Sequence, residues 1–259
     1  MKQKASFPKF SFNKKITFPK NHVIIYGKHS CYSALKNSER EKLILLTNDK
    51  NYNFWREEVL KINLNIKILS LNQKELDEIS NFNSHQNIIL ITKPLRKASL
   101  KEYLTKKNTQ TNHKIILLDQ ITDPQNIGSI IRSAFAFSFD AVGILKKNSP
   151  SESPSLIKAS SGEIEKIKLI ELKNLVNEIK LLQDNGFYVY GLSNEGNKNI
   201  KNLINTDHKF ALVIGAEGKG IRKLTKETVD DIIHIPINKK CDSINVSNAA
   251  AIAMYQLTQ

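Results

Sequence analysis

Cysteine is scarce in this chain of 259 residues, which has only Cys31 and Cys241, far apart in the sequence. Two such positions are not spaced as zinc ligands, and they do not form a disulfide scaffold. We therefore expect reduced thiols, no metal site and a cytoplasmic protein. Long apolar runs are also lacking. None approaches the ~20 residues of a membrane helix, and the first residues have no apolar stretch of a secretory signal. These absences favour a protein without a membrane partner.

Acidic residues are few relative to basic ones. The chain has 25 Asp and Glu against 39 Lys and Arg, which gives a formal net charge of +14. An excess of this size favours a polyanionic partner, most often nucleic acid, with an anionic membrane surface as the other candidate. The content of hydrophobic residues, 40%, is ordinary for a globular protein and disfavours wholesale disorder, a collagen repeat and a coiled coil.

The first 20 residues differ in composition from the rest. Residues 1–20 contain six Lys, four Phe and two Pro but no acid. Such a composition cannot bury a core and predicts a flexible basic arm. The arm suits contacts with RNA phosphates, with Phe available for base stacking. It suits a solubilising tail equally well, and its basic, acid-free composition is also like that of some organelle transit peptides. The sequence leaves these interpretations open.

Two further regions alternate apolar, β-branched runs with runs of helical spacing, which predicts α/β structure. The first region, residues 21–95, predicts a small domain with strands at 22–26, 42–47, 65–70 and 87–93, and with helices at 29–38, 53–63 and 72–80. Residues 96–113 are polar and predict a linker that begins with a helical turn. The second region predicts strands at 114–119, 141–145, 187–193, 210–215 and 231–236, with helices at 126–138, 172–185 and 245–257.

The strands of residues 114–259 are apolar throughout rather than alternating, as a parallel sheet covered on both faces requires. Ligands of such sheets bind beyond the carboxyl ends of the strands. The loop after 114–119 is therefore a candidate site. Asp123 or Asn126 suits the cap of the helix that follows, and Arg132 falls six residues after Asn126. The plain alternatives are a capping Asn126 and a solvent-facing Arg132.

The loop after 210–215 has three glycines in six residues, which lets backbone approach a ligand closely. It fails the P-loop and Rossmann patterns, because Ile221 and Arg222 follow Gly220 and Lys223 stands where a third glycine is needed. ATP and NAD are therefore disfavoured, although a ligand loop is still expected.

The loop after 231–236 leads into the closing helix. Asp242 or Ser243 suits the cap of that helix, and Asn245 and two further polar residues follow. The alternative to capping is a polar pocket for a ligand.

In order and spacing, the three loops resemble the motifs of the SpoU (TrmH-like) branch of the SPOUT RNA 2′-O-ribose methyltransferases. The matching stretches are DPQNIGSIIRSA (123–134), LVIGAEGKGI (212–221) and IPINKKCDSINVSNAAAIA (235–253). IYGKHSCYSAL (25–35) and SHQNIIL (84–90) resemble the substrate domain of the 23S rRNA guanosine 2′-O-methyltransferases. Cys31 stands there in place of the usual Val and Asn87 in place of the usual Gly, and Glu163 stands where the catalytic domain commonly has Ala.

The resemblance implies a fold, a cofactor and partners. The implied fold is a SPOUT domain with a parallel sheet and a deep trefoil knot over 114–259, preceded by a small α/β/α ribosomal-protein-like RNA substrate-binding domain. The implied cofactor is S-adenosyl-L-methionine, the implied partner is RNA rather than DNA, and the implied assembly is a homodimer packed through its C-terminal helices. The implied reaction is methyl transfer to a ribose 2′-hydroxyl.

The resemblance also implies site residues. Arg132 matches the family's catalytic Arg, and because guanidinium stays protonated, our hypothesis is a clamp on the phosphate beside the target ribose. Asn126 is expected to place Arg132 and the substrate, and Glu217 to orient Arg132 by a charge-assisted bond. Ser243 and Asn245 are expected beside the methyl donor and the ribose.

Cofactor contacts of the family are mostly with backbone atoms and map to Gly215, Ile235 and Ile244. Ile244 stands where the family usually has Leu, and a backbone contact should survive that change. Members that act on tRNA often lack a separate substrate domain, so large-subunit rRNA is the favoured substrate. The target is expected to be a guanosine, as in the methyltransferases that the N-terminal domain resembles. The alternatives are a tRNA or adenosine-specific rRNA methyltransferase of the same family, a non-catalytic ribosome assembly factor, and a nucleotide-dependent enzyme.

Overall fold

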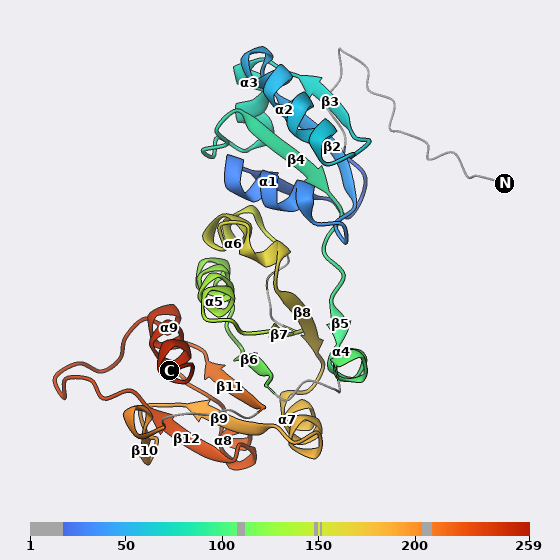
Figure 1. Cartoon of the computed structure of the whole chain (residues 1–259). Coiled ribbons are helices and arrows are strands. Elements are labelled where there is room, and N and C mark those ends of the chain that lie inside the picture. Colours follow the sequence, from blue (N-terminus) through green and yellow to red (C-terminus); the bar gives the residue numbers. More distant parts are fainter. Residues whose placement is uncertain (1–17, 108–111, 148–149, 151, 204–208) are drawn as a thin grey trace.

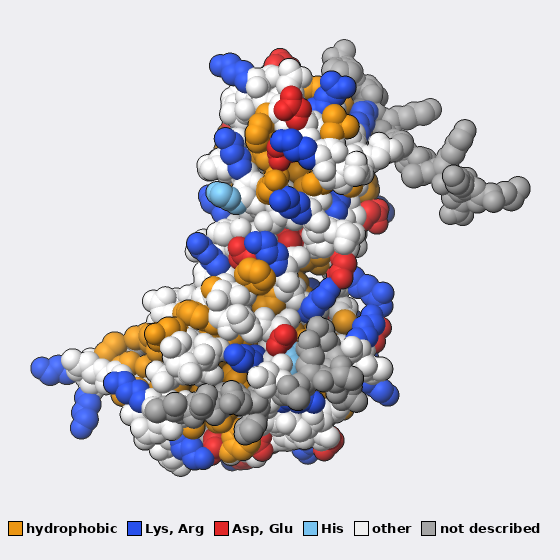
Figure 2. Space-filling view, in the orientation of Figure 1, with side chains coloured by type: hydrophobic (Ala, Val, Ile, Leu, Met, Phe, Trp, Pro, Cys, Tyr) orange, Lys and Arg blue, Asp and Glu red, His pale blue; other side chains and the backbone are white. Residues whose placement is uncertain are grey.

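The computed structural model describes residues 18–107, 112–147, 150, 152–203 and 209–259. The described residues form two α/β domains stacked one on the other, with the N-terminal domain at the top of Figure 1. The basic arm predicted for residues 1–20 lies almost entirely outside the described residues. Lys and Arg side chains are spread over the visible face of both domains (Figure 2), in line with the net charge of +14.

The N-terminal domain has the four strands and three helices that its sequence pattern predicts. The strands are β1 (Val23–Tyr26), β2 (Lys42–Thr47), β3 (Lys67–Ser70) and β4 (Ile88–Thr92), and the helices are α1 (Lys28–Lys36), α2 (Asp49–Lys61) and α3 (Gln73–Ile79). The sheet order is β1-β4-β2-β3, with β4 antiparallel to both β1 and β2 and with β3 parallel to β2.

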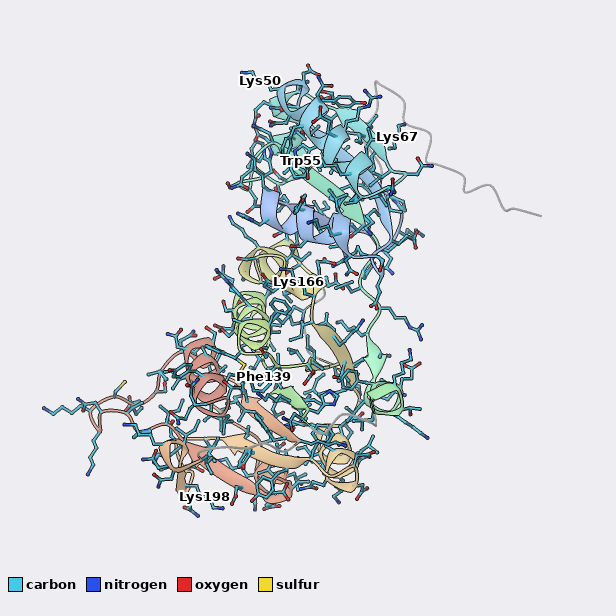
Figure 3. All side chains as sticks on the ribbon, in the orientation of Figure 1. Lys50, Trp55, Lys67, Phe139, Lys166 and Lys198 are labelled. Atoms are coloured by element: carbon cyan, nitrogen blue, oxygen red, sulfur yellow. The ribbon has the colours of Figure 1, made fainter. Side chains whose placement is uncertain are left out.

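Helices cover both faces of this sheet. Trp55 of α2 packs with Cys31 of α1 and with Ile25 and Leu45 of the sheet in one core cluster (Figure 3). Leu76 of α3 packs against the opposite face. The N-terminal domain is therefore the α/β/α layer structure that was expected. Cys31 is fully buried, so a residue of about the size of Val occupies this core position.

The second domain contains all five strands and three helices predicted for residues 114–259, together with elements that the sequence pattern missed. Its strands are β5 (Ala98–Ser99), β6 (Lys114–Asp119), β7 (Ala141–Leu145), β8 (Lys168–Leu172), β9 (Tyr188–Leu192), β10 (Lys198–Asn199), β11 (Phe210–Gly215) and β12 (Asp231–His234). Its helices are α4 (Leu100–Lys107), α5 (Pro124–Ala136), α6 (Pro154–Ala159), α7 (Leu175–Asp184), α8 (Lys223–Thr228) and α9 (Val246–Gln256), with 3-10 turns η1 (Glu163–Glu165) and η2 (Ile200–Asn202).

The eight strands form one sheet in the order β10-β12-β9-β11-β6-β7-β8-β5, and every neighbouring pair is parallel. Helices α5, α6 and α9 pack on one face, in a core that includes Phe139 (Figure 3). Helices α4 and α7 pack on the other face. The predicted parallel sheet with two covered faces is confirmed.

The segment 96–113, expected as a linker, contains secondary structure that belongs to the second domain. β5 pairs with β8, and Leu100, Tyr103 and Leu104 of α4 are buried in the core of the second domain. The Tyr103 hydroxyl lies 2.5 Å from Nε2 of His113, and burial raises the pKa of this tyrosine. The polar composition of residues 96–113 did not predict these contacts, because only one side of α4 is apolar.

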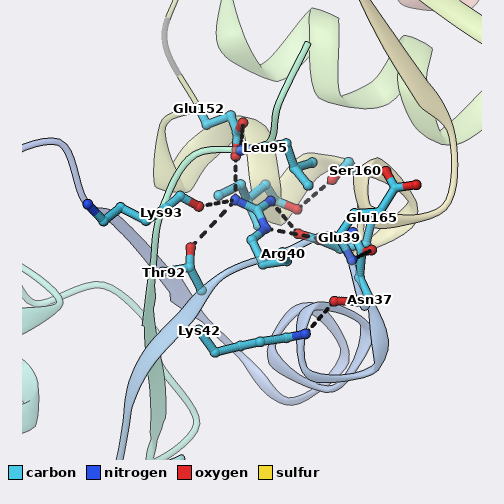
Figure 4. A network of polar contacts seen from close by, with 11 residues as sticks. Asn37, Glu39, Arg40, Lys42, Thr92, Lys93, Leu95, Glu152, Ser160 and Glu165 are labelled. Atoms are coloured by element: carbon cyan, nitrogen blue, oxygen red, sulfur yellow. Dashed lines mark hydrogen bonds and ion pairs between the residues drawn. The ribbon is translucent and has the colours of Figure 1, made fainter. Parts of the chain in front are cut away.

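A buried arginine joins the two domains. Arg40, which lies between α1 and β2 and is only 2% exposed, extends toward two glutamates of the second domain (Figure 4). Its Nη1 lies 2.7 Å from Oε2 of Glu152, and its Nε donates to Glu165 at 3.1 Å. Burial penalises the charged guanidinium, but the bonds with Glu165 and the charge of Glu152 outweigh this and raise the pKa of Arg40.

Apolar and backbone contacts complete the junction. Ile157 of α6 is buried in the core cluster of the N-terminal domain, and a Cβ added at Gly162 would lie 2.6 Å from Oγ of Ser33. Glu163 follows Gly162 directly and begins η1. Its Oε2 lies 2.9 Å from Nζ of Lys166. The departure from the family pattern at Glu163 therefore lies in the turn at the domain junction.

Candidate active site at the carboxyl ends of the strands

A pocket of about 320 Å³ lies beyond the carboxyl ends of β9, β11 and β12. Five residues singled out from the sequence line it: Gly215, Glu217, Ile235, Ser243 and Ile244. They come from the last residue of β11 and from the loops after β11 and β12, so the structure brings together two motifs that are separate in the sequence. We call this cavity the Gly215 pocket.

The loop after β11 folds back onto its own strand. The Gly220 N–H donates to the Ala216 carbonyl at 2.8 Å, and Gly218 and Gly220 have φ of +78° and +63°. A Cβ at Gly215 would lie 2.0 Å from the carbonyl carbon of Gly220, so no side chain fits there. Glycine is therefore required at Gly215 by contact and at the two later positions by backbone conformation.

Asp119, at the carboxyl end of β6, fixes this loop and was not recognised from the sequence. The buried carboxylate accepts hydrogen bonds from Nε of Arg222 at 2.7 Å, from the Arg222 N–H at 3.1 Å and from Oγ1 of Thr225 at 3.1 Å. Its position as the last residue of a buried strand was the available signal. Asp119 thus holds the start of α8, directly after the second motif, against the end of β6.

Asn126 and Asn245 connect the first and third motifs. Nδ2 of Asn245 donates to Oδ1 of Asn126 at 3.1 Å. Asp123 caps α5, so the interpretation of Asn126 as a cap is wrong. Asn245 caps α9 through the N–H groups of its first turn, so the capping role considered for Asp242 and Ser243 falls to Asn245 instead.

Arg132 lies on α5, and its side chain is exposed. Among the described residues it forms no hydrogen bond or ion pair, so the expected bond with Glu217 is not present there. Glu217 is also exposed, at the Gly215 pocket. Arg132 is not among the residues that line the Gly215 pocket, whereas Glu217 is. Both charges are exposed and without a partner among the described residues, which is a different arrangement from a preformed pair.

The walls of the Gly215 pocket combine apolar and charged surface. Leu192, Ile214 and Val246 supply apolar wall, while Glu195, Lys226 and Asp242 supply charges. Glu195 and Lys226 form an ion pair across the lining, and Nδ2 of Asn194 donates to the Asp242 carbonyl at 3.0 Å. Such a cavity suits a small ligand with an apolar ring and a charged end. Among residues 18–107, 112–147, 150, 152–203 and 209–259, no group of acids, His and Cys is placed to hold a metal.

Comparisons with known proteins agree with this architecture. Residues 113–255 match the model of the SpoU rRNA Methylase family, and residues 24–98 match that of an RNA 2'-O ribose methyltransferase substrate binding domain. The fold and the pocket define a two-domain α/β protein with a small-ligand site at the strand ends. The chain belongs to the SpoU family of RNA methyltransferases.

Relatives match most of the chain. An uncharacterized tRNA/rRNA methyltransferase of Borreliella burgdorferi is 37% identical over 74% of this chain and 87% of its own length. A putative TrmH family tRNA/rRNA methyltransferase of Staphylococcus saprophyticus is 30% identical over 91% of this chain and 94% of its own. The AdoMet-bound rRNA methyltransferase structure from Sinorhizobium meliloti aligns with a TM-score of 0.78 at 18% identity, over 92% of this chain and 87% of that one.

The described part of the chain contains no helix with the length and apolarity to cross a membrane.

Proposed function

We propose that this protein transfers a methyl group from S-adenosylmethionine to a ribose 2′-hydroxyl of RNA. The observation that supports this most is the meeting of three motifs at one place. Two of them line the Gly215 pocket, and the first reaches the third through the bond between Asn126 and Asn245. A methyl donor in the pocket would then lie beside the helix that bears Arg132.

S-adenosylmethionine is the cofactor, and when bound it supplies an activated methyl group on a sulfonium that is an excellent leaving group. The pocket suits it, because apolar walls fit the adenine and Glu195, Lys226 and Glu217 offer charges to the amino-acid end. Gly215, Ile235 and Ile244 would hold it through backbone atoms. Since Ile244 would use its backbone only, Ile in place of the usual Leu is tolerable.

The remaining site residues have roles in positioning the acceptor. Asn126, held by Asn245, would fix the ribose, and Ser243 at the pocket wall would lie near the methyl donor. Arg132 would bind the phosphate next to that ribose, and Glu217 would face it once RNA is bound. Alignment of oxygen, carbon and sulfur supplies much of the rate in such a transfer.

The Gly215→Ala change tests the cofactor assignment. We expect about 3 kcal/mol lower stability, because the new methyl group overlaps the Gly220 backbone, and cofactor affinity reduced about tenfold or more. Titration calorimetry with S-adenosylmethionine and urea unfolding measure both. Gly186→Ala is the control: Gly186 has a positive φ, no atom lies within 4 Å of the added Cβ, and the residue does not line the Gly215 pocket. It should lose only about 1–2 kcal/mol and keep most of its cofactor affinity. Equal loss of affinity in both variants would contradict the placement of the cofactor.

The favoured substrate is a guanosine in large-subunit rRNA, which implies a cytoplasmic ribosomal target. The N-terminal substrate domain supports this choice, as does the net charge of +14. The Sinorhizobium meliloti protein of similar fold is named an rRNA methyltransferase. The second candidate is a tRNA, because the Borreliella and Staphylococcus relatives have tRNA/rRNA in their names.

A homodimer and a trefoil knot belong to the same proposal. The loops of residues 216–220 and 235–244 both reach the Gly215 pocket, as the knotted arrangement of the family would require.

The homodimer is supported by exposed apolar side chains. Ile252 and Tyr255 of α9 are 44% and 52% exposed, and Phe135 of α5 is also exposed. Hydrophobic surface is visible on the α9 side of the molecule in Figure 2. Exposed apolar residues on a helix suit an interface between copies.

The Ile252→Asp change tests the dimer. We expect the unchanged protein to sediment as a dimer in analytical ultracentrifugation, and the variant to shift toward the monomer because a charge is costly in an apolar interface. Leu60→Asp, at an exposed leucine of α2 in the other domain, is the control and should stay dimeric. A monomeric unchanged protein would contradict the homodimer.

Incubation with tritiated S-adenosylmethionine tests the substrate. Separately purified large-subunit rRNA and tRNA, both unmodified, are offered to the full chain. We expect label in the rRNA alone. Label in tRNA alone would favour the second candidate. Cofactor binding without label in either RNA would instead support a non-catalytic assembly factor.

A further inference from the structure

The segment from Glu152 to Lys166 lies between the N-terminal domain and the helix that bears Arg132. We call residues 152–166 the junction segment. Its helix α6 contacts β1 of the N-terminal domain and α5 of the second domain, and its turn η1 contacts α1 and α5. In Figure 1, α1, α6 and α5 follow one another from the upper domain to the lower one. One short piece of chain therefore touches both the N-terminal domain and a helix of the candidate active site.

Adjacent side chains of α6 are buried in two different cores. Leu156 belongs to the core cluster that contains Ile127 and Ile131 of α5, whereas Ile157 belongs to the core cluster of the N-terminal domain. Leu156 is 3% exposed and Ile157 is 1% exposed. Because protein interiors are close-packed and transmit strain, α6 cannot shift against one domain without disturbing its contact with the other.

The contact between α6 and α5 is a close one. A Cβ added at Gly128 of α5 would lie 2.4 Å from the Leu156 carbonyl oxygen, so the two backbones touch four residues before Arg132. Nζ of Lys166 also lies 5.1 Å from the ring centre of Phe135 on α5 (Figure 3). The position of the junction segment therefore determines the position of α5.

Buried polar contacts hold the other side of the junction segment. Both glutamates that bind Arg40 belong to this segment, and each accepts one more hydrogen bond from outside it (Figure 4). Nδ2 of Asn37 donates to Oε2 of Glu165 at 2.8 Å, and the Leu95 N–H donates to Oε1 of Glu152 at 2.7 Å. Hydrogen bonds are directional, so these bonds fix the angle between the two domains as well as their distance.

We propose that the junction segment selects the nucleotide that is methylated, because it fixes the distance and angle between RNA on the N-terminal domain and Arg132. Methyl transfer needs the attacking oxygen about 3–3.5 Å from the carbon, and a displacement of about 1 Å costs about 100-fold in rate. Arg40 and Gly162 are then positioning residues, since neither lines the Gly215 pocket. This inference rests on the proposed function.

The Gly162→Ala variant tests the inference without removing a charge. The new Cβ would lie 2.6 Å from Oγ and 2.9 Å from Cβ of Ser33, so α1 must move away from the junction segment. Gly186→Ala is the matched control. The two glycines have φ of +87° and +79°, but no atom lies within 4 Å of the Cβ added at Gly186. Methylation of large-subunit rRNA by each full-length variant is measured at several RNA concentrations, and the methylated nucleotides are mapped.

We expect Gly162→Ala to lower kcat about 10- to 100-fold and to spread the methyl groups over nucleotides next to the original target. KM for RNA and the affinity for S-adenosylmethionine should stay unchanged, because the surfaces that bind the two molecules are intact. Gly186→Ala should behave as the unchanged protein does. A variant that is only less stable would give less active protein but would not move the target.

A compensating change provides the rescue. Ser33→Gly removes both atoms that the new methyl group overlaps, so the double variant with Gly162→Ala should regain most of the rate and the original target. Ser33→Gly alone, which weakens α1 slightly, should leave the target unchanged. A double variant as slow as Gly162→Ala would overturn the inference, since the loss would then come from backbone strain at Gly162 rather than from a displaced domain.

The Arg40→Met variant tests the polar contacts of the junction. At a temperature where Trp55 fluorescence reports folded protein, we expect it to spread the methyl groups as Gly162→Ala does. Lys168→Met removes only an exposed ion pair across the same junction and should keep the original target. If Arg40→Met does not fold, the Gly162→Ala series decides the question.

The outcomes separate this inference from the proposed function. Methylation of one and the same nucleotide by the unchanged protein, Gly162→Ala and every other folded variant would overturn the inference and leave the proposed function standing. No methylation of any RNA by the unchanged protein would contradict the proposed function and this inference with it.

Discussion

The Arg132→Ala variant is expected to lose methyl transfer by at least about 100-fold while it still binds S-adenosylmethionine. Loss of one preorganised charged contact in a transition state commonly costs that much in kcat. Arg132 is exposed on α5 and forms no bond with another described residue, so its removal should leave the fold intact. Single-turnover transfer of tritiated methyl to rRNA, together with cofactor titration, measures both quantities.

The Arg132→Lys variant distinguishes the possible roles of this side chain. A simple phosphate clamp needs a positive charge, which lysine supplies, so much of the activity should remain. Activity as low as that of the alanine variant would show that a positive charge is not enough. The planar donor geometry of the guanidinium, or removal of the proton from the 2′-hydroxyl by Arg132, would then be required. Arg56→Ala, at an exposed arginine on α2, is the control and should leave kcat unchanged.

The Arg40→Met variant is expected to lose about 3–5 kcal/mol of unfolding free energy, because it removes the guanidinium charge that two buried glutamates share. The side chains of Glu152 and Glu165 are 4% and 1% exposed, so water cannot solvate the two carboxylates once the guanidinium is gone. Urea unfolding followed by Trp55 fluorescence measures the effect, since Trp55 lies in the core of the N-terminal domain next to the junction.

Two comparisons make this prediction specific. Lys168→Met breaks an exposed ion pair with Glu39 across the same junction and should cost only about 0–1 kcal/mol. The triple change Arg40→Met, Glu152→Met and Glu165→Met leaves no unpaired charge and should recover much of the stability. A triple variant as unstable as Arg40→Met would show that packing, rather than charge, holds the domains together.

Most of the sheet structure was predictable because buried strands here are short apolar runs. All nine predicted strands are present. β8 was missed because Lys168 and Glu171 interrupt its apolar pattern, although its remaining residues are buried. β5 and β10 have two residues each, too few for any periodicity.

Contacts between distant segments were not predictable from one sequence. Asn245 and Asn126 are separated by 119 positions, and Arg40 and Glu165 by 125. Local patterns suggested a cap for Asn126, because Asn is a good capping residue. The structure assigns that role to Asp123, three residues earlier, which frees the Asn126 amide to meet Asn245.

The position and chemistry of the transferred methyl group test the central claim most directly. Large-subunit rRNA is incubated with the protein and labelled S-adenosylmethionine, digested, and analysed by mass spectrometry for the modified nucleoside. The account predicts one 2′-O-methylated guanosine, present with the unchanged protein and absent with Arg132→Ala. A methyl group on a base rather than on a ribose, or equal transfer by the Arg132→Ala variant, would contradict it.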